Sequence, residues 1–209
     1  DSDGDFSQTS LALGKHSLTY SKSGYFDTNL TGLLETDGQT LDLEGVRLLP
    51  DNCTSGTMSG TITDAVTGDN MTGVHQHIIP GINQVYLSAN WRQWSTGYGA
   101  GWYTDSNGVW SLSKDAGWYT ILSHISGYYW GYHNVYACGN RAGQNNSLSE
   151  RLNPGEMRIM LTWPLTSPQT GSDLDSHLQI PDNASGTDHV MYKNSNKTSV
   201  CSETTIRMF

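Results

Sequence analysis

Two aspartates and a histidine alternate along the segment Asp173-Leu174-Asp175-Ser176-His177. In an extended strand the three charged or polar side chains face one side, with successive same-side residues about 7 Å apart. Two carboxylates and an imidazole on one face compete unless a cation or hydrogen-bond donors gather them, and His189 could join from a neighbouring strand. Oxygen ligands would favour Ca²⁺, the candidate metal here, or Mg²⁺, while two histidines shift the preference toward Zn²⁺ or Mn²⁺. The alternative is a structural polar network, in which Asp175 and His177 hydrogen-bond the adjacent backbone.

Two other segments carry weaker metal signals. His75 and His77 put two imidazoles on one side of an extended segment, which hints at zinc but lacks a third ligand in the sequence nearby. The acidic run 1–5 resembles a calcium loop, but its counterpart about 103 residues later, 105–109, reads as a hairpin turn. A turn is therefore the favoured interpretation of both copies.

Aromatic residues are concentrated between positions 91 and 136. A β-sandwich of this size has room for a few large aromatics in its core, and Trp110, Trp118 and Tyr136 are expected there. The surplus is expected at a surface, where it would form an interface or stack on sugar rings. These candidates are Trp91, Trp94, Tyr98, Trp102, Tyr103, Tyr129 and Trp130.

The composition narrows the functional classes. The chain has 209 residues and a net charge of −9, with no cluster of basic residues, which argues against a nucleic-acid partner. No run of 18 apolar residues is present, so no membrane span is expected. Signatures of a catalytic nucleophile or of a phosphate-binding loop are also missing, so we expect a protein that is not an enzyme.

The sequons, together with a composition low in Lys and rich in Thr, Ser, Gly, Tyr and Trp, favour an extracellular location. Of the three cysteines, Cys53 and Cys138 flank one repeat, and their pairing would tie its first strand to its last; the alternative is that they stay unpaired. Cys201 would be free or would pair outside this chain. N-linked glycans are expected at some of the six Asn-x-Ser/Thr sites, which begin at Asn29, Asn52, Asn70, Asn145, Asn183 and Asn196.

Alternating patterns and turn signals predict an all-β protein. Strands are expected at 17–20, 30–34 and 41–48, then at 61–65, 84–88, 109–112, 118–124 and 132–137. No segment has a convincing helical period. Residues 140–153 are polar and read as a loop that ends in a domain boundary.

A near-repeat organises the chain. Residues 14–25 align with 117–128, and both segments end in Ser-Gly-Tyr. A repeat of this length indicates a whole domain. We therefore expect tandem β-sandwich domains whose terminal copies are incomplete.

The second copy resembles the carboxypeptidase regulatory-like domain family. The resemblance rests on Gly60-Thr-Ile-Thr-Asp-Ala65-Val-Thr-Gly68, on 104–112, and on Gly117-Trp-Tyr119 with Ser126-Gly127-Tyr128. It implies a prealbumin-like or Ig-like seven-stranded sandwich and a non-catalytic scaffold or adhesion role. The expected domains are 1–52, the C-terminal half of one such domain, and 53–152, a complete one.

The last segment is similar to a different group, the YfaP-like secreted domains of unknown function. The similarity rests on 157–163, on the Asp-Leu-Asp-Ser-His-Leu string at 173–178, and on His189-Val-Met-Tyr192. It implies that 153–209 is the N-terminal part of such a domain.

Half-domains leave unpaired strand edges, which means either that the chain is part of a longer array of domains or that neighbouring copies complete each other by strand addition. We therefore expect an extracellular structural protein, the repeating subunit of a glycosylated surface filament whose partners are copies of itself. The alternative is a carbohydrate-binding adhesin or an accessory module of a secreted enzyme, with glycans as partners. A metal-dependent hydrolase is a distant third.

Overall fold

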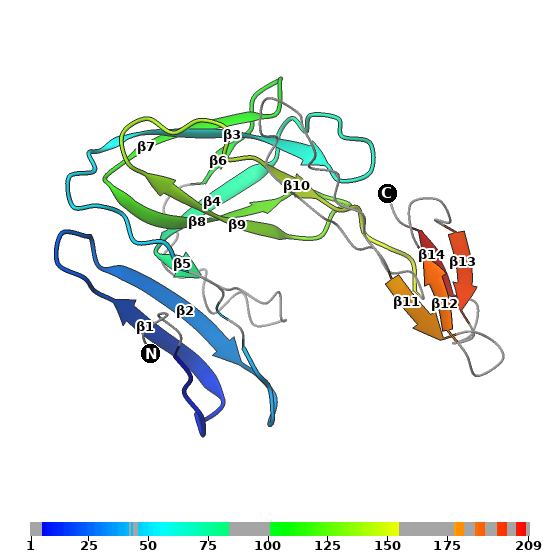
Figure 1. The fold of residues 1–209 in the computed structure, drawn as a ribbon. Helices are drawn as coiled ribbons and strands as arrows, with labels where there is room; N and C mark the ends of the chain where they lie inside the picture. The colour runs from blue at the N-terminus through cyan, green and yellow to red at the C-terminus, as the bar shows by residue number, and fades with distance from the viewer. Residues whose placement is uncertain are drawn as a thin grey trace, which may run out of the picture. The chain divides into compact units, whose positions relative to one another are not determined.

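The computed structural model describes residues 6–41, 43, 46–83 and 101–154, together with four short strands between 178 and 207 (Figure 1). The chain divides into two compact units, 1–149 and 150–209. All regular structure in the described residues is β-strand, which confirms the prediction of an all-β fold. No helix with the length and apolarity needed to cross a membrane occurs in this part of the chain.

The centre of the first unit is a sandwich of two sheets (Figure 1). One sheet has the strand order β10-β3-β7, from Asn146–Leu148, Gly56–Asp64 and Val109–Lys114. The other has the order β6-β4-β8-β9, from Trp102–Tyr103, His75–Pro80, Gly117–His124 and Gly131–Ala137. Within each sheet the neighbouring strands are antiparallel, except that β10 runs parallel to β3.

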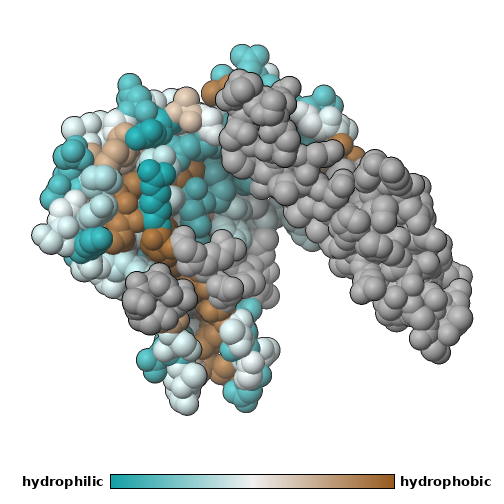
Figure 2. Space-filling model, viewed as in Figure 1, coloured by the Kyte–Doolittle hydropathy of each residue, from teal (hydrophilic) through white to brown (hydrophobic). Residues whose placement is uncertain are grey.

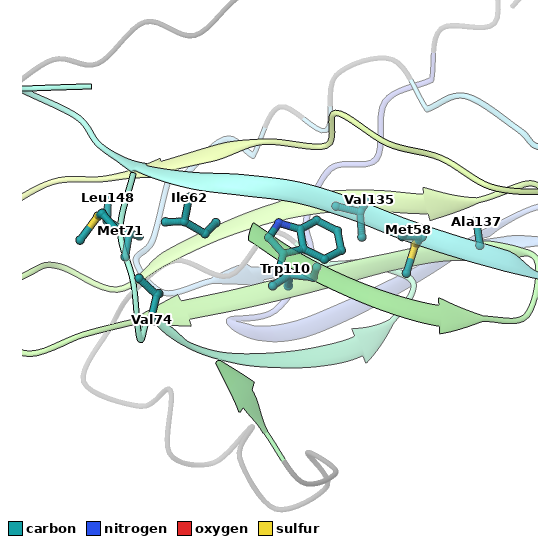
Figure 3. Close-up of a cluster of buried hydrophobic side chains, with 9 residues drawn as sticks. Met58, Ile62, Met71, Val74, Trp110, Val135, Ala137 and Leu148 are labelled. Atoms are coloured by element: carbon teal, nitrogen blue, oxygen red, sulfur yellow. The ribbon is translucent and has the colours of Figure 1, made fainter. Parts of the chain in front are cut away.

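Alternation along the strands builds the core between the sheets. On β3 every second residue from Met58 to Asp64 is buried, so one face of this strand lies against the core. This face is apolar except for Asp64, the last residue of the strand. Trp110 of β7 is only 1% exposed and lies among the side chains of both sheets (Figure 3). The cluster of buried residues comprises Met58, Ile62, Met71, Val74, Trp110, Ile121, Val135, Ala137 and Leu148.

The predicted core position of Trp110 is therefore correct, but those of Trp118 and Tyr136 are wrong. These two residues are opposite each other on β8 and β9, and their rings pack 5.0 Å apart. Because Ile121 of β8 belongs to the core, Trp118, an odd number of residues away, points to the other face of the sheet. There its indole Nε1 donates a hydrogen bond to the carbonyl of Arg47.

A disulfide joins Cys53, which precedes β3, to Cys138, which follows β9. This is the pairing considered from the sequence. It links the two sheets of the sandwich, because β3 and β9 belong to different ones. Strand β10, inside the segment expected to be a loop, comes after the disulfide and pairs with β3 over Ile62–Asp64.

The N-terminal hairpin repeats part of the sandwich. Strands β1 (Gly14–Tyr20) and β2 (Thr28–Leu34) pair with Gly14 opposite Leu34, and β8 and β9 pair with Gly117 opposite Ala137. The residue numbers of these two pairings differ by 103, which is also the offset of the sequence repeat. The turn hydrogen bond from Tyr25 N–H to the Lys22 carbonyl likewise has a counterpart between Tyr128 and Ile125. The sequence repeat is thus a repeat of strand register.

The expected third strand of the first copy is not formed at its described positions. Leu41, Leu43 and the stretch 46–49 have no strand pairing, although Leu41 and Leu43 pack over Gly32 of β2. A short strand β5 (Ile82–Asn83), from the chain of the second copy, instead pairs with β2 in parallel.

The second unit contains two hairpins among its described residues. Strand β11 (Leu178–Pro181) pairs with β12 (Thr187–Val190), and β13 (Asn196–Ser199) pairs with β14 (Thr204–Arg207). All four strands are antiparallel to their partners.

Candidate metal centre and aromatic surface

Three histidines converge on one face of the four-stranded sheet. His75 and His77 are two residues apart on β4 and therefore share a face, while Gln76 between them is fully buried on the other. His124, at the end of β8, is directly opposite His75. Since opposite residues in antiparallel strands point to the same side, all three imidazoles gather on the outer face.

The three rings are in mutual contact. His75 Nδ1 lies 2.8 Å from His124 Nε2, at hydrogen-bonding distance. The His75 and His77 ring centroids are 4.4 Å apart, and the His77 and His124 rings lie nearly parallel at 5.8 Å. One nitrogen atom from each ring lies within 4.8 Å of the other two. Such a set of nitrogen donors is within reach of a single metal ion.

The pKa values of two of the three imidazoles are lowered. Burial lowers the pKa of His77, and the neighbouring His75 lowers it further. Burial also lowers the pKa of His124, with additional contributions from His75 and His77. Both shifts favour the neutral forms of His77 and His124, in which one ring nitrogen carries a free lone pair.

Aromatic side chains border the cluster. The Tyr103 ring of β6 stacks on His75 at 4.6 Å, and Trp130 stacks on His124 at 4.1 Å. The backbone of Gly101 lies so close to His75 that a side chain at this position would collide with Nε2 of the ring. These contacts restrict the orientation of the two imidazoles that face each other.

The sequence prediction for this region is partly corrected by the structure. Of the seven aromatic residues expected at a surface, Tyr103 is 64% exposed and Tyr129 44% exposed. Trp102, in contrast, packs against the core, because its strand pairing places it opposite the buried Gln76. Trp130 is partly buried on its histidine neighbour, and Trp91, Trp94 and Tyr98 lie outside the described residues.

His124 is the member of the cluster that sequence reasoning missed. It ends a strand that the alternating pattern predicts, but the pattern contains no signal for its register against β4. From the sequence alone, His75 and His77 were therefore two candidate ligands with no third. The other predicted metal ligands, Asp173, Asp175 and His177, lie outside the described residues, and His189 is on β12 opposite Gln179.

Four of the six sequons have exposed asparagines in the first unit. These are Asn29, Asn52, Asn70 and Asn145. The Asn29 and Asn145 side-chain oxygens accept hydrogen bonds from the Thr19 hydroxyl and the Thr61 N–H. Asn183 lies outside the described residues, and Asn196 begins β13.

Comparison with known proteins identifies structural neighbours only. No protein-family model and no curated protein sequence matches the chain. The resemblances to the carboxypeptidase regulatory-like and YfaP-like families therefore stay predictions.

Solved structures with similarity to this chain include two pilins and the Bacillus anthracis TIE protein. The shaft pilin SpaA from Lactobacillus rhamnosus GG is 15% identical, with a TM-score of 0.34, over 69% of this chain and 63% of the pilin. The Streptococcal ancillary pilin is 13% identical, with a TM-score of 0.34, over 87% of this chain and 60% of that one. The Bacillus anthracis TIE protein is 15% identical, with a TM-score of 0.31, over 87% of this chain and 32% of that one. The chain thus spans less than two thirds of each of these proteins.

Proposed function

We propose that this protein is an extracellular structural protein, a subunit of a surface filament that assembles through its β-domains. The proposal rests on one observation, the open side of the N-terminal hairpin. Strands β1 and β2 reproduce β8 and β9 in register, yet β1 has no described neighbour on its other side. In the complete copy that position is taken by β4, which pairs with β8 from His75 to Pro80.

An open edge of this kind is a site for strand addition. The outer backbone groups of β1 can bond a further strand, and the repeat defines this strand as β4-like and antiparallel to β1. We assign it to a neighbouring copy of the chain. Each copy would then complete the sheet of the next, which produces a head-to-tail polymer.

Exposed apolar side chains accompany the open edge. Phe6, Leu11 and Leu13, in the segment before β1, are 53%, 43% and 52% exposed. Figure 2 shows hydrophobic residues at the surface in the region of the N-terminal hairpin, bordered by hydrophilic ones. Contact with a neighbouring subunit would remove this apolar surface from water.

The disulfide is consistent with an extracellular location. Cys53 and Cys138 join the two sheets of the sandwich, and such bonds persist in oxidising compartments. We further propose that exposed sequons carry N-linked glycans and that the protein has no enzymatic activity. Calcium binding by Asp173, Asp175, His177 and His189 also remains our proposal for the second unit.

Electron microscopy of native material from the source tests the filament. We expect regular fibres whose repeating unit contains this chain. A substitution of Leu18 by Lys, on the half-buried face of β1, should prevent assembly of the recombinant chain. Ser17→Lys, on the exposed face of the same strand, is the matched control and should assemble. Isolated particles in the native material, or fibres that form equally well with both variants, would contradict the proposal.

A second candidate function is carbohydrate binding. It is favoured by the exposed ring of Tyr103, which lies on the outer sheet face beside the histidines, and by the exposed ring of Tyr129. Sugar faces stack on such rings. A glycan-array signal that disappears with Tyr103→Ala or Tyr129→Ala, while filaments still form, would favour the binding module.

A further inference from the structure

We propose that His75, His77 and His124 form a binding site for a divalent transition-metal ion, with Zn²⁺ as the best match. The site is independent of the filament proposal. It also differs in position and in ligand type from the acidic segment at 173–177, since its described ligands are all imidazoles.

The backbone brings the ligands together without distortion. Two histidines at alternate positions of one strand, with a third directly opposite on the next, form a triangle on a single sheet face. Tetrahedral zinc with Zn–N bonds of 2.0–2.1 Å needs nitrogen atoms about 3.3 Å apart. The His75–His124 pair is at 2.8 Å, and all three ligand atoms lie within 4.8 Å of one another. Small side-chain rotations would therefore reach the coordination geometry.

The donor set selects the class of ion. Calcium and magnesium prefer oxygen ligands, and the cluster contains no carboxylate. Imidazole nitrogen suits Zn²⁺, Cu²⁺ and Ni²⁺. Without a metal, the His75–His124 hydrogen bond needs a donor N–H on one ring and a lone pair on the other. Metal binding replaces this bond, and a change of tautomer in one ring supplies the second lone pair.

The described surroundings hold the rings in place at the protein surface. Tyr103 and Trp130 stack on His75 and His124, and the Gly101 backbone packs against His75. Contacts of this kind orient metal ligands before the ion binds. Tyr103 is 64% exposed, so the site is at the protein surface. The described residues supply three ligands, and a tetrahedral ion has a fourth position for water or another donor.

Titration of the chain with the metal alone tests the site. We expect Zn²⁺ to bind and to raise the melting temperature, and Co²⁺ to give the visible absorption spectrum of a tetrahedral nitrogen-ligated ion. His124→Gln keeps the size and polarity of the side chain but removes the imidazole, and should weaken Zn²⁺ binding at least about 100-fold. His77→Gln should have a similar effect.

Two control variants separate this site from other histidines. His16→Gln removes a histidine of the N-terminal hairpin, where His16 Nε2 is hydrogen-bonded to the Ala12 backbone, and should bind Zn²⁺ like the wild type. His177→Gln removes a ligand of the site predicted in the second unit. Circular dichroism of metal-free samples checks that each variant folds.

Three results would overturn the proposal. The first is the absence of saturable Zn²⁺ binding to the wild type. The second is unchanged affinity in a folded His124→Gln variant. The third is loss of binding and of the Co²⁺ spectrum in His177→Gln but not in His124→Gln.

Discussion

The Tyr128 hydroxyl donates a 2.6 Å hydrogen bond to Asp64 Oδ2 across 64 residues of sequence. Asp64 ends β3 and is 8% exposed, and its other carboxylate oxygen accepts the N–H groups of Val66 and Thr67. One side chain therefore closes the turn after β3 and ties it to the segment between β8 and β9. This contact connects the two sheets at the end of the sandwich.

Removing the hydroxyl at Tyr128 should destabilise the sandwich. Tyr128→Phe leaves a buried carboxylate oxygen with one partner fewer, and hydrogen bonds to charged groups are worth about 1.5–3 kcal/mol. Asp64→Ala should cost more, because it also releases the two N–H groups of the turn. Denaturant unfolding measures the stability of both variants. The control is Tyr129→Phe, at a neighbouring position that is 44% exposed. Equal stability of Tyr128→Phe and the control would contradict the assignment.

A single methyl group at Gly60 should disrupt the packing of β3. Cβ at this position would overlap the Gln144 backbone carbonyl and would approach Trp110 Nε1 to 2.9 Å. Backbone cannot yield as a flexible side chain does, so Gly60→Ala should reduce the free energy of unfolding by about 1–3 kcal/mol. Ser59→Ala, the adjacent position on β3, should change it little. A Gly60→Ala melting temperature equal to that of Ser59→Ala would disprove the steric argument.

Acid should weaken the sandwich through His133. Burial lowers the pKa of this residue from 6.5 to about 4. Between pH 6.5 and about pH 4, His133 is therefore protonated in the unfolded chain but neutral in the folded chain. Stability should fall as the pH drops through this window, by up to about 3 kcal/mol in total.

The variant His133→Gln separates this contribution from those of other groups. His77 and His124 also have lowered pKa values and act in the same direction, so the quantity to compare is the difference in pH slope between variant and wild type. Urea unfolding at several pH values between 4 and 7.5 measures that slope. An unchanged slope in His133→Gln would show that His133 is not protected from protons in the folded state.

Reduction of the disulfide should lower the stability of the first unit substantially. The bond between Cys53 and Cys138 closes a loop with a sequence separation of 85 residues. In the chain-entropy model a loop of that length is worth about 4–5 kcal/mol. Urea unfolding with and without reductant measures the effect, which a Cys53→Ser/Cys138→Ser variant should reproduce. Cys201→Ser should leave the stability unchanged.

The same bond should limit extension under force. A pull on the chain before Cys53 and after β10 is carried across the disulfide, so the residues between the two cysteines cannot be drawn out. Single-molecule pulling should give an extension roughly 300 Å longer after reduction, at about 3.5 Å per residue. Equal extensions in both redox states would show that the disulfide does not carry the pulling force.

Much of the fold could be predicted from local pattern. The strands expected at 17–20, 30–34, 109–112, 118–124 and 132–137 all lie within observed strands, and the one expected at 61–65 overlaps β3, which ends at Asp64. The strand expected at 84–88 lies outside the described residues. The repeat was also visible, because the same turn residues and alternation recur at the same spacing. Its structural counterpart is the shared register of β1–β2 and β8–β9.

Predictions that depend on a distant partner were less successful. The stretch 41–48 alternates like a strand but has no partner in the described structure, whereas polar β10 becomes a strand because β3 is available beside it. Trp118 was expected in the core and Trp102 at a surface, whereas Trp118 is on the outer face of its sheet and Trp102 packs against the core. Aromatic content does not indicate which face of a sheet is buried.

The sequence by itself therefore determined the all-β class, the repeat of the hairpin pattern and two of the three clustered imidazoles. These features depend on the alternation and turn preferences of neighbouring residues, which the chain carries locally. Only the tertiary structure decided that His124 lies opposite His75 and that no described strand pairs with the outer edge of β1. Strand order and register arise from packing between segments far apart in the chain, and no local pattern specifies them.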